Sequence, residues 1–205
     1  FLTNPGYVSR VPLYPLIVAF VSLLPFETIS SLQCWHALMD VITLSCIYLF
    51  VLRYFTDRCA LFAGLLYAFY PLAIYRLVMI NTEIIQATAV VFWGGAVMKL
   101  LESRQIRDAV FLSFLSAVMV YLNPATQLIP IFFAVFILFR YPLGCSSKLA
   151  AASLIPLVVI CLSWGTRNYV VTGDFFFFDV RGGKEFWLGN HPQFEGRWEG
   201  PQKEE

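Results

Sequence analysis

Glu83 is the residue of this sequence best suited to chemistry, because it opens a long apolar run beside an otherwise uncharged joint. Ionisable residues at membrane depth are costly and usually functional, so a cavity-facing Glu83 could hold a metal ion or a sugar hydroxyl. The simpler alternative is a carboxylate favoured by the helix dipole in the first turn, after Asn81 or Thr82 as N-cap. The residues alone leave both interpretations open.

Basic residues that could neutralise a phosphate lie near both ends of the chain. Arg10 stands just ahead of two prolines, and its planar fork could meet a lipid phosphate. A general attraction of an interfacial arginine to anionic head groups is the alternative. Arg167, Arg181 and Lys184 follow the last apolar run and could serve the same purpose, unless they only form an anchoring belt.

A glycine-rich stretch accompanies these last basic residues. Gly182 and Gly183 would allow a backbone to approach a ligand closely, and Gly189-Asn190-His191-Pro192 follows. Ordinary turn chemistry is the alternative, and His191 beside a proline is more typical of a turn than of a base. Gly182-Gly183-Lys184 lacks the spacing and the strand–helix context of a P-loop.

Other polar residues favour structural roles. His36 and Asp40 are four residues apart and share one helix face, where a helix-packing hydrogen bond is favoured over catalysis. Arg76 is expected to extend outward toward the membrane surface. The five cysteines are scattered without metal-ligand spacing, and no Ser/His/Asp set or histidine pair can be assembled.

The composition indicates a membrane protein. Hydrophobic residues make up 59% of the chain and charged residues only 13%, whereas a soluble domain has about 25% charged residues. Such a chain could not cover a water-exposed surface, but lipid accepts apolar side chains on all sides. The net charge of +1 gives no support for nucleic-acid binding. We therefore predict an all-α, polytopic membrane helix bundle.

The apolar runs define the expected elements. Spanning the hydrocarbon core takes about 20 apolar residues. We predict a transmembrane helical region over 1–171 and a structured external loop over 172–205, with an interfacial helix at 11–26, where three prolines shorten the run. The six predicted spans lie at about 31–52, 59–80, 83–101, 108–122, 126–140 and 149–166.

The basic residues predict the orientation of these spans. Short-loop Lys and Arg mark the cytoplasmic side of a membrane. One set of loops carries almost all of them, whereas the joints at 81–82 and 123–124 carry none. Phe1 to Ser31 and residues 167–205 are therefore expected on the external side, together with Glu83. The basic set consists of Arg53, Arg58, Lys99, Arg104, Arg107, Arg140 and Lys148.

Several segments resemble the C-type, lipid-phosphate-sugar-dependent glycosyltransferases, the superfamily of the protein O-mannosyltransferases and the lipid A aminoarabinose transferases. Residues 10–15 resemble an R-P-P-L-Y-P segment of that superfamily, and 66–71 with 81–83 resemble its L-Y-P…S-E stretch. The most specific match is W-G-T-R-N-Y at 164–169 with Gly173, Gly182-Gly183 and W-L-G-N-H-P at 187–192. It resembles the W-x-x-R-N-Y…G…G-G…L-G-N-N-P signature of bacterial members.

The resemblance implies an enzyme of the bacterial inner (plasma) membrane. It would move a sugar from a polyprenyl-phosphate carrier to an acceptor on the external side, in a single displacement with inversion. The acceptor could be a glycan, a lipid or a protein. The resemblance fixes no cofactor, and a divalent metal ion is possible.

The resemblance also implies roles for individual residues. Glu83 matches the superfamily's second acidic site near the reaction centre, and Arg10 falls at or next to a phosphate-contacting position. Arg167 and Lys184, with Asn168, Gly182, Gly183, Asn190 and His191, belong to the external loop that closes over the carrier and its sugar.

Two departures from the pattern accompany the match. The first external loop, with its main catalytic acid, is expected upstream of Phe1, so we interpret the chain as a fragment that is inactive alone. Asn123 stands where many members have an arginine before the proline, which puts a phosphate role there in doubt. The alternative functions are a transporter or flippase of lipid-linked sugars, and a non-catalytic membrane subunit.

Overall fold

The computed structural model describes residues 11–23, 25, 27–79, 81–178, 186, 187, 189 and 190, and these form helices joined by short turns, with no strand among them. The predicted all-α class is therefore confirmed. The helices are α1 (Leu13–Val21), α2 (Thr28–Tyr54), α3 (Asp57–Ala68), α4 (Pro71–Leu77), α5 (Glu83–Ser103), α6 (Ile106–Leu122), the short 3-10 helix η2 (Pro124–Thr126), α7 (Leu128–Arg140) and α8 (Leu143–Thr172).

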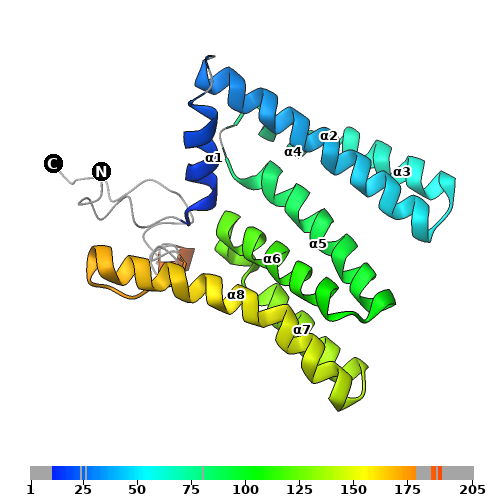
Figure 1. Ribbon diagram of the computed structural model, residues 1–205. Helices are drawn as coiled ribbons and strands as arrows, with labels where there is room; N and C mark the ends of the chain where they lie inside the picture. The colour runs from blue at the N-terminus through cyan, green and yellow to red at the C-terminus, as the bar shows by residue number, and fades with distance from the viewer. Residues whose placement is uncertain are drawn as a thin grey trace.

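The long helices pack side by side in a bundle that α1 crosses at one end (Figure 1). Helix α2 packs on α3 and α5, α5 packs on α6, and α8 packs on both α6 and α7. Helix α1 contacts α2 and α6. A helix thus lies within the predicted run 11–26, although it is shorter than that run, and its place at the membrane interface stays a prediction.

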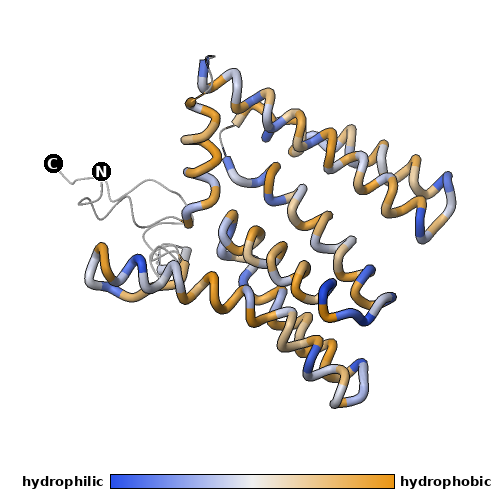
Figure 2. Tube along the Cα trace, in the orientation of Figure 1, coloured by the Kyte–Doolittle hydropathy of each residue, from blue (hydrophilic) through white to orange (hydrophobic). Residues whose placement is uncertain are grey.

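The connections separate the two ends of the bundle by polarity. The α2–α3, α5–α6 and α7–α8 turns all lie at the end remote from α1, and hydrophilic residues gather there (Figure 2). We call this the basic end, because its turns carry Arg53, Arg58, Arg104, Arg107 and Arg140. The opposite end, called the α1 end, holds α1, the α4–α5 connection, η2 and the last turns of α8. The assignment of the α1 end to the external side stays a prediction.

The predicted span 59–80 is not one continuous helix. It is divided into α3 and α4, whose axes differ by 52°. The break falls where Tyr70 takes extended backbone angles (φ −70°, ψ 110°) immediately before Pro71. A proline disfavours the helical conformation of the preceding residue and cannot donate a backbone hydrogen bond, which explains the bend.

Helix α8 extends beyond its predicted span of 149–166 at both ends, because polar residues such as Ser146 and Asn168 are compatible with helix outside an apolar run. It contains Pro156, which lacks the N–H of a regular helical residue. The next amide, at Leu157, donates to Oγ of Ser113 on α6 at 3.0 Å. A serine on the neighbouring helix therefore satisfies the backbone beside the proline.

Among the described residues, fewer than six helices are long and apolar enough to span a membrane by themselves. Helices α2, α5 and α8 are each long and apolar enough to cross a membrane, and the bent α3–α4 pair gives a fourth if it is one span. Helix α6 has 17 residues and α7 has 13, which is short for a crossing. The six-span count stays a prediction.

Small residues allow the central helices to pack closely. Ala96, Ala109, Ala134 and Ala150 are buried together on α5, α6, α7 and α8, around larger side chains such as Leu112. This core lies between α1 and the basic turns. It fixes the positions of the helix ends that carry the candidate site.

Candidate functional site

Glu83 lies at the first residue of α5 and forms an ion pair with Arg76 of α4. Thr82 is the N-cap residue of α5 and makes no side-chain capping bond, but Oδ1 of the preceding Asn81 accepts a hydrogen bond from the Glu83 backbone N at 3.2 Å. Both side chains of the ion pair are partly exposed. The guanidinium of Arg76 is engaged by Glu83, and its extension toward the membrane surface stays a prediction. The carboxylate is thus held by a cation and remains accessible.

The connection between α4 and α5, which precedes Glu83, contacts the beginning of α2. Nε2 of Gln33 donates to the carbonyl of Val78 at 3.4 Å. One turn further along α2, His36 is fully buried, and its Nε2 lies 3.4 Å from the hydroxyl of Tyr14 on α1. Helix α2 therefore supports the connection that precedes Glu83, and α1 packs on the same part of α2.

Asp40 has the structural role favoured from the sequence. The hydroxyl of Tyr67 on α3 donates to its Oδ1 at 2.7 Å, which joins α2 to α3. The predicted helix-packing hydrogen bond is thus confirmed. Asp40 is engaged away from the α4–α5 connection.

Arg167 lies at the α1 end of α8, where it stacks on an aromatic ring. Its guanidinium carbon is 4.8 Å from the ring centroid of Trp164, and its Nη1 donates to Oδ1 of Asn168 at 3.1 Å. An arginine positioned over a tryptophan keeps its outer N–H groups free to meet an anion. The geometry therefore suits a phosphate contact at Arg167.

Asn168 is fully buried, and its amide group is used within the chain. Its Nδ2 donates to the carbonyl of Phe176 at 2.9 Å, while its Oδ1 accepts from Arg167. Asn168 therefore anchors the residues after α8. A direct contact with substrate stays a prediction.

Residues 173–178 fold back along α8. Gly173 ends the helix in the left-handed region (φ 81°), and its amide donates to the carbonyl of Tyr169 at 2.9 Å. A Cβ at Gly165 would lie 2.9 Å from Cζ of Phe175, so this glycine makes room for the returning ring. Phe178 completes the contact against Tyr121 of α6, with ring centroids 6.2 Å apart. We call residues 173–178 the return segment.

An apolar groove of about 320 Å³ lies between α1, α6 and α8. Its walls include Leu13 and Leu16 from α1, Phe114 and Tyr121 from α6, and Trp164 from α8. We call it the Trp164 groove. Arg167 does not line the groove itself, but its guanidinium lies over the ring of Trp164, which does, so a cationic group lies beside the apolar groove.

Asn123 supports the chain at the α6–η2 joint. Its Oδ1 accepts from the backbone N of Ala125 at 3.1 Å, and its carbonyl accepts from the hydroxyl of Thr126 at 2.9 Å. These bonds close the turn that starts η2. This structural use agrees with the doubt about a phosphate role.

Five of the predicted site residues lie outside the described residues: Arg10, Gly182, Gly183, Lys184 and His191. The residue after Arg10, Val11, is buried among residues of α6 and α8. Asn190 is described and exposed, and its Nδ2 donates to the carbonyl of Phe186 at 2.7 Å.

Within the described part of the chain, no group of three or more His, Cys, Asp or Glu side chains could hold a metal ion. The described protein groups of the site are instead a carboxylate, two guanidinium groups and an apolar groove. The prediction of a possible divalent metal remains untested.

Two features of the site were missed from the sequence. The Trp164 groove depends on three helices that are far apart in the chain, so no local pattern indicates it. The return segment did leave a signal, because Gly165 lies inside an otherwise bulky helix and Phe175–Phe178 is an unbroken aromatic run after the helix ends.

Apolar helices long enough to span a bilayer indicate a membrane protein, and an ion-paired carboxylate and an apolar groove with a nearby guanidinium lie at one end of it. The model of the dolichyl-phosphate-mannose-protein mannosyltransferase family matches residues 9–164, and the chain belongs to this family. The family match confirms the resemblance seen in the sequence and indicates a membrane glycosyltransferase of the mannosyltransferase type. No curated protein and no solved structure matches the chain.

Proposed function

We propose that this chain is the part of an inverting membrane glycosyltransferase that receives a polyprenyl-phosphate-linked sugar at the α1 end. The sugar passes to an acceptor on the external side of the bacterial plasma membrane. The family match supports the transfer reaction, and the family description names a lipid-phosphate-linked mannose. The acceptor is a glycan, a lipid or a protein.

The Trp164 groove with Arg167 beside it is the observation that carries this proposal. A polyprenyl phosphate has a long apolar chain and a compact anionic head. The groove offers apolar walls from three helices, and Arg167 supplies a positive charge beside them. Arg167 can present two N–H groups to phosphate oxygens, a geometry that lysine cannot reproduce.

The reaction assigns different tasks to the charged groups. The acceptor hydroxyl attacks the anomeric carbon and gives its proton to a carboxylate that acts as general base. The bond between the anomeric carbon and the phosphate oxygen breaks, and the lipid phosphate leaves with the electron pair of that bond. Arg167, with Arg10 and Lys184, stabilises that charge. Glu83 orients the reacting sugar or its acceptor near the anomeric carbon, while Arg76 holds its carboxylate in place.

Binding of a short-chain polyprenyl phosphate to the intact protein in nanodiscs tests this proposal. Arg167→Gln removes the cation at the groove, and we expect the carrier to bind at least about tenfold more weakly, as for loss of a charge-assisted hydrogen bond. Arg53→Gln at the basic end is the control and should bind as the wild type does. Equal weakening by both substitutions would show a general electrostatic attraction and contradict the assignment.

The groove itself is tested by a matched pair on α8. Ser163 lines the Trp164 groove and is exposed, so Ser163→Phe should fill the groove and reduce carrier binding. Thr166→Phe places the same ring on an exposed position of the same helix that does not line the groove. Unchanged carrier binding by the Ser163→Phe variant would show that the carrier does not bind in the Trp164 groove.

The bend between α3 and α4 favours the alternative class, a transporter or flippase of lipid-linked sugars, because broken helices are typical of transporters. The two classes differ in product. Intact protein in sealed vesicles that moves the lipid-linked sugar across the bilayer, without transfer to any acceptor, would favour the transporter.

A further inference from the structure

A second apolar groove, of about 310 Å³, lies toward the basic end between α2, α5 and α6. Its walls include Leu49 of α2, Phe92 and Gly95 of α5, and Phe111 of α6, and Lys99 also lines it. We call it the Lys99 groove. It shares no lining residue with the Trp164 groove, and the inference below does not depend on the proposed function.

The walls of the Lys99 groove are exposed on the surface of the helix bundle. Leu49, Phe92 and Phe111 are all exposed large hydrophobic residues. Gly95 contributes to the space, because a Cβ built there would meet no heavy atom within 4 Å. The groove is therefore an open apolar channel of the kind that an acyl chain can occupy.

Lys99 supplies a positioned charge on this groove. Its side chain is 62% exposed, and its Nζ lies 3.3 Å from Oδ1 of Asp108. The Asp108 side chain is only 6% exposed, and its other oxygen accepts from Oγ of Ser103 at 2.5 Å. Asp108 is thus fixed and holds Lys99 in place, while the ammonium group has further N–H donors for an anion.

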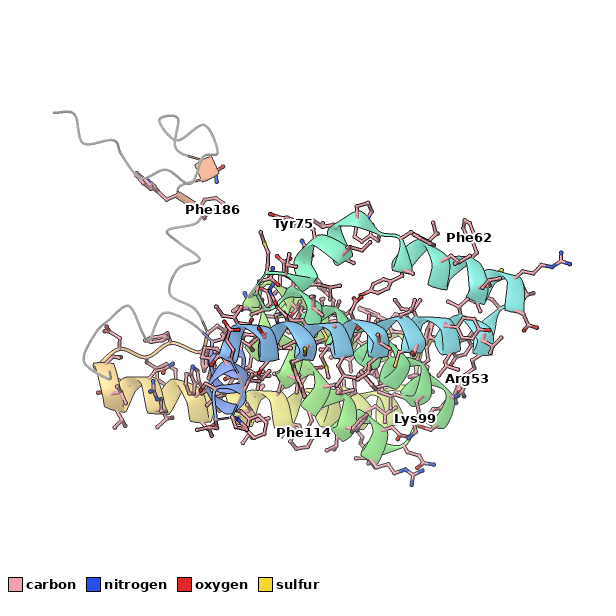
Figure 3. All side chains as sticks on the ribbon, turned by 90° about the horizontal axis from the view of Figure 1, so that it is seen from above. Arg53, Phe62, Tyr75, Lys99, Phe114 and Phe186 are labelled. Carbon is pink, nitrogen blue, oxygen red and sulfur yellow. The ribbon has the colours of Figure 1, made fainter. Side chains whose placement is uncertain are left out.

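The surroundings of Lys99 favour an anion. Arg53 lies at the same end of the molecule as Lys99 (Figure 3). The α5–α6 turn adds Arg104 and Arg107, whereas Glu102 is engaged by Arg53 at 2.7 Å and by the hydroxyl of Tyr54 at 2.8 Å. An anionic group at Lys99 would therefore meet net positive charge.

We propose that the Lys99 groove binds one anionic phospholipid of the surrounding bilayer. Its phosphate lies at Lys99, and one of its acyl chains runs along the groove between α2 and α5 toward Phe92. Charge complementarity at Lys99 and apolar lining beyond it select an anionic glycerophospholipid over a zwitterionic one. The lipid joins three helices at the end opposite to the proposed reaction.

Native mass spectrometry of the intact protein tests this, with phosphatidylglycerol or phosphatidylcholine added after delipidation. We expect the wild type to prefer phosphatidylglycerol by about fivefold, the preference that one lysine near a surface contributes. Lys99→Gln should abolish the preference and Lys99→Arg should restore it, so a folding defect is distinguishable from a lost charge. Lys148→Gln, an exposed lysine on α8, should keep the preference.

The acyl-chain part of the site has its own matched pair. Gly95→Leu fills the groove, whereas Gly94→Leu places the same side chain on the neighbouring position, which is equally open but does not line the groove. We expect Gly95→Leu to reduce the retention of phosphatidylglycerol and Gly94→Leu to leave it unchanged.

Several results would overturn the proposal. The first is an equal loss of the phosphatidylglycerol preference in Lys148→Gln and Lys99→Gln. The second is undiminished retention of phosphatidylglycerol by Gly95→Leu. The third is displacement of phosphatidylglycerol from this groove by polyprenyl phosphate. A change of oligomeric state in Gly95→Leu without a change in lipid retention would assign the groove to a second copy of the chain.

Discussion

Each end of α5 carries a glutamate that pairs with an arginine, but the surroundings of the two pairs differ. At the α1 end Glu83 pairs with Arg76, and at the basic end Glu102 pairs with Arg53. The Glu83 and Glu102 side chains are 40% and 45% exposed, so accessibility does not separate them. Glu102 lies among charged turn residues, whereas Glu83 lies beside an uncharged joint that is supported by Gln33.

The ends also differ in how they are built. The basic end consists of short turns, and its charged side chains lie mostly on the surface. The α1 end contains a helix laid across the bundle and the return segment, which packs aromatic rings onto Gly165 and Tyr121. A site that must hold a substrate needs side chains fixed by packing, and the buried His36 and Asn168 give the α1 end this construction. Substitutions at the α1 end should therefore cost more than matched substitutions elsewhere.

Gly165→Leu should have the largest structural effect. Its Cβ would lie 2.9 Å from Phe175, so the return segment has to move, and overpacking of this kind costs about 1–3 kcal/mol. Thermal unfolding in detergent should shift downward, and limited proteolysis should cleave within residues 173–178. A Cβ at Gly144 on the same helix would meet no heavy atom within 4 Å, so Gly144→Leu should leave the unfolding temperature and the cleavage pattern unchanged. Resistance of Gly165→Leu to the protease would contradict the packing described for this end.

Asn168→Leu should have the next largest effect. It removes the donor to the Phe176 carbonyl and the acceptor for Arg167, and a buried group left without a partner costs about 1–3 kcal/mol. The matched control is Asn190→Leu, since exposed Asn190 donates to the carbonyl of Phe186 and water can replace that bond. Equal unfolding temperatures for the two variants would remove the anchoring role of Asn168.

The centre of the bundle should respond less strongly. Ser113→Ala leaves the Leu157 amide beside Pro156 without its side-chain acceptor. Interhelical hydrogen bonds in membrane proteins contribute about 0.6 kcal/mol, up to about 1.7. We expect a small loss of stability in a denaturation series, and none for Ser45→Ala, whose hydroxyl only bonds to Val41 of its own helix. A Ser45→Ala loss as large as that of Ser113→Ala would contradict this assignment.

The two ion pairs should contribute least to stability. Exposed ion pairs are worth about 0–1 kcal/mol, so Arg76→Gln and Arg53→Gln should each change the free energy of unfolding by less than about 1 kcal/mol. Chemical denaturation at low and high salt measures this. A large loss for Arg76→Gln alone would make the Arg76–Glu83 pair a structural element.

The sequence predicted the elements that depend on local chemistry. The start of α5 follows from the polar pair Asn81-Thr82, of which Thr82 is the N-cap residue and Asn81 accepts from the first helical amide. The joint at Asn123-Pro124 ends α6 as expected. Alternation of basic and uncharged joints also predicted which connections share an end of the bundle. Each of these features can be identified from the residue types within a single short segment or joint.

Features that depend on several helices could not be predicted. Apolar continuity over 59–80 suggested one span, although Tyr70-Pro71 already contained the signal for the bend. The Arg76–Glu83 pair forms only because α4 and α5 meet across that region. Both grooves likewise arise from helices that are distant in the sequence, so hydropathy cannot reveal them.

The central claim is that Glu83, and not its counterpart Glu102, takes part in sugar transfer. Transfer from a polyprenyl-phosphate sugar should be measured with the intact protein for Glu83→Gln and Glu102→Gln, after equal folding has been confirmed. We expect Glu83→Gln to lose at least about 100-fold of the rate, as for loss of a catalytic carboxylate. Glu102→Gln should stay within about twofold of the wild type, since it removes only a surface ion pair. Full activity of Glu83→Gln, or an equal loss in both variants, would contradict the account.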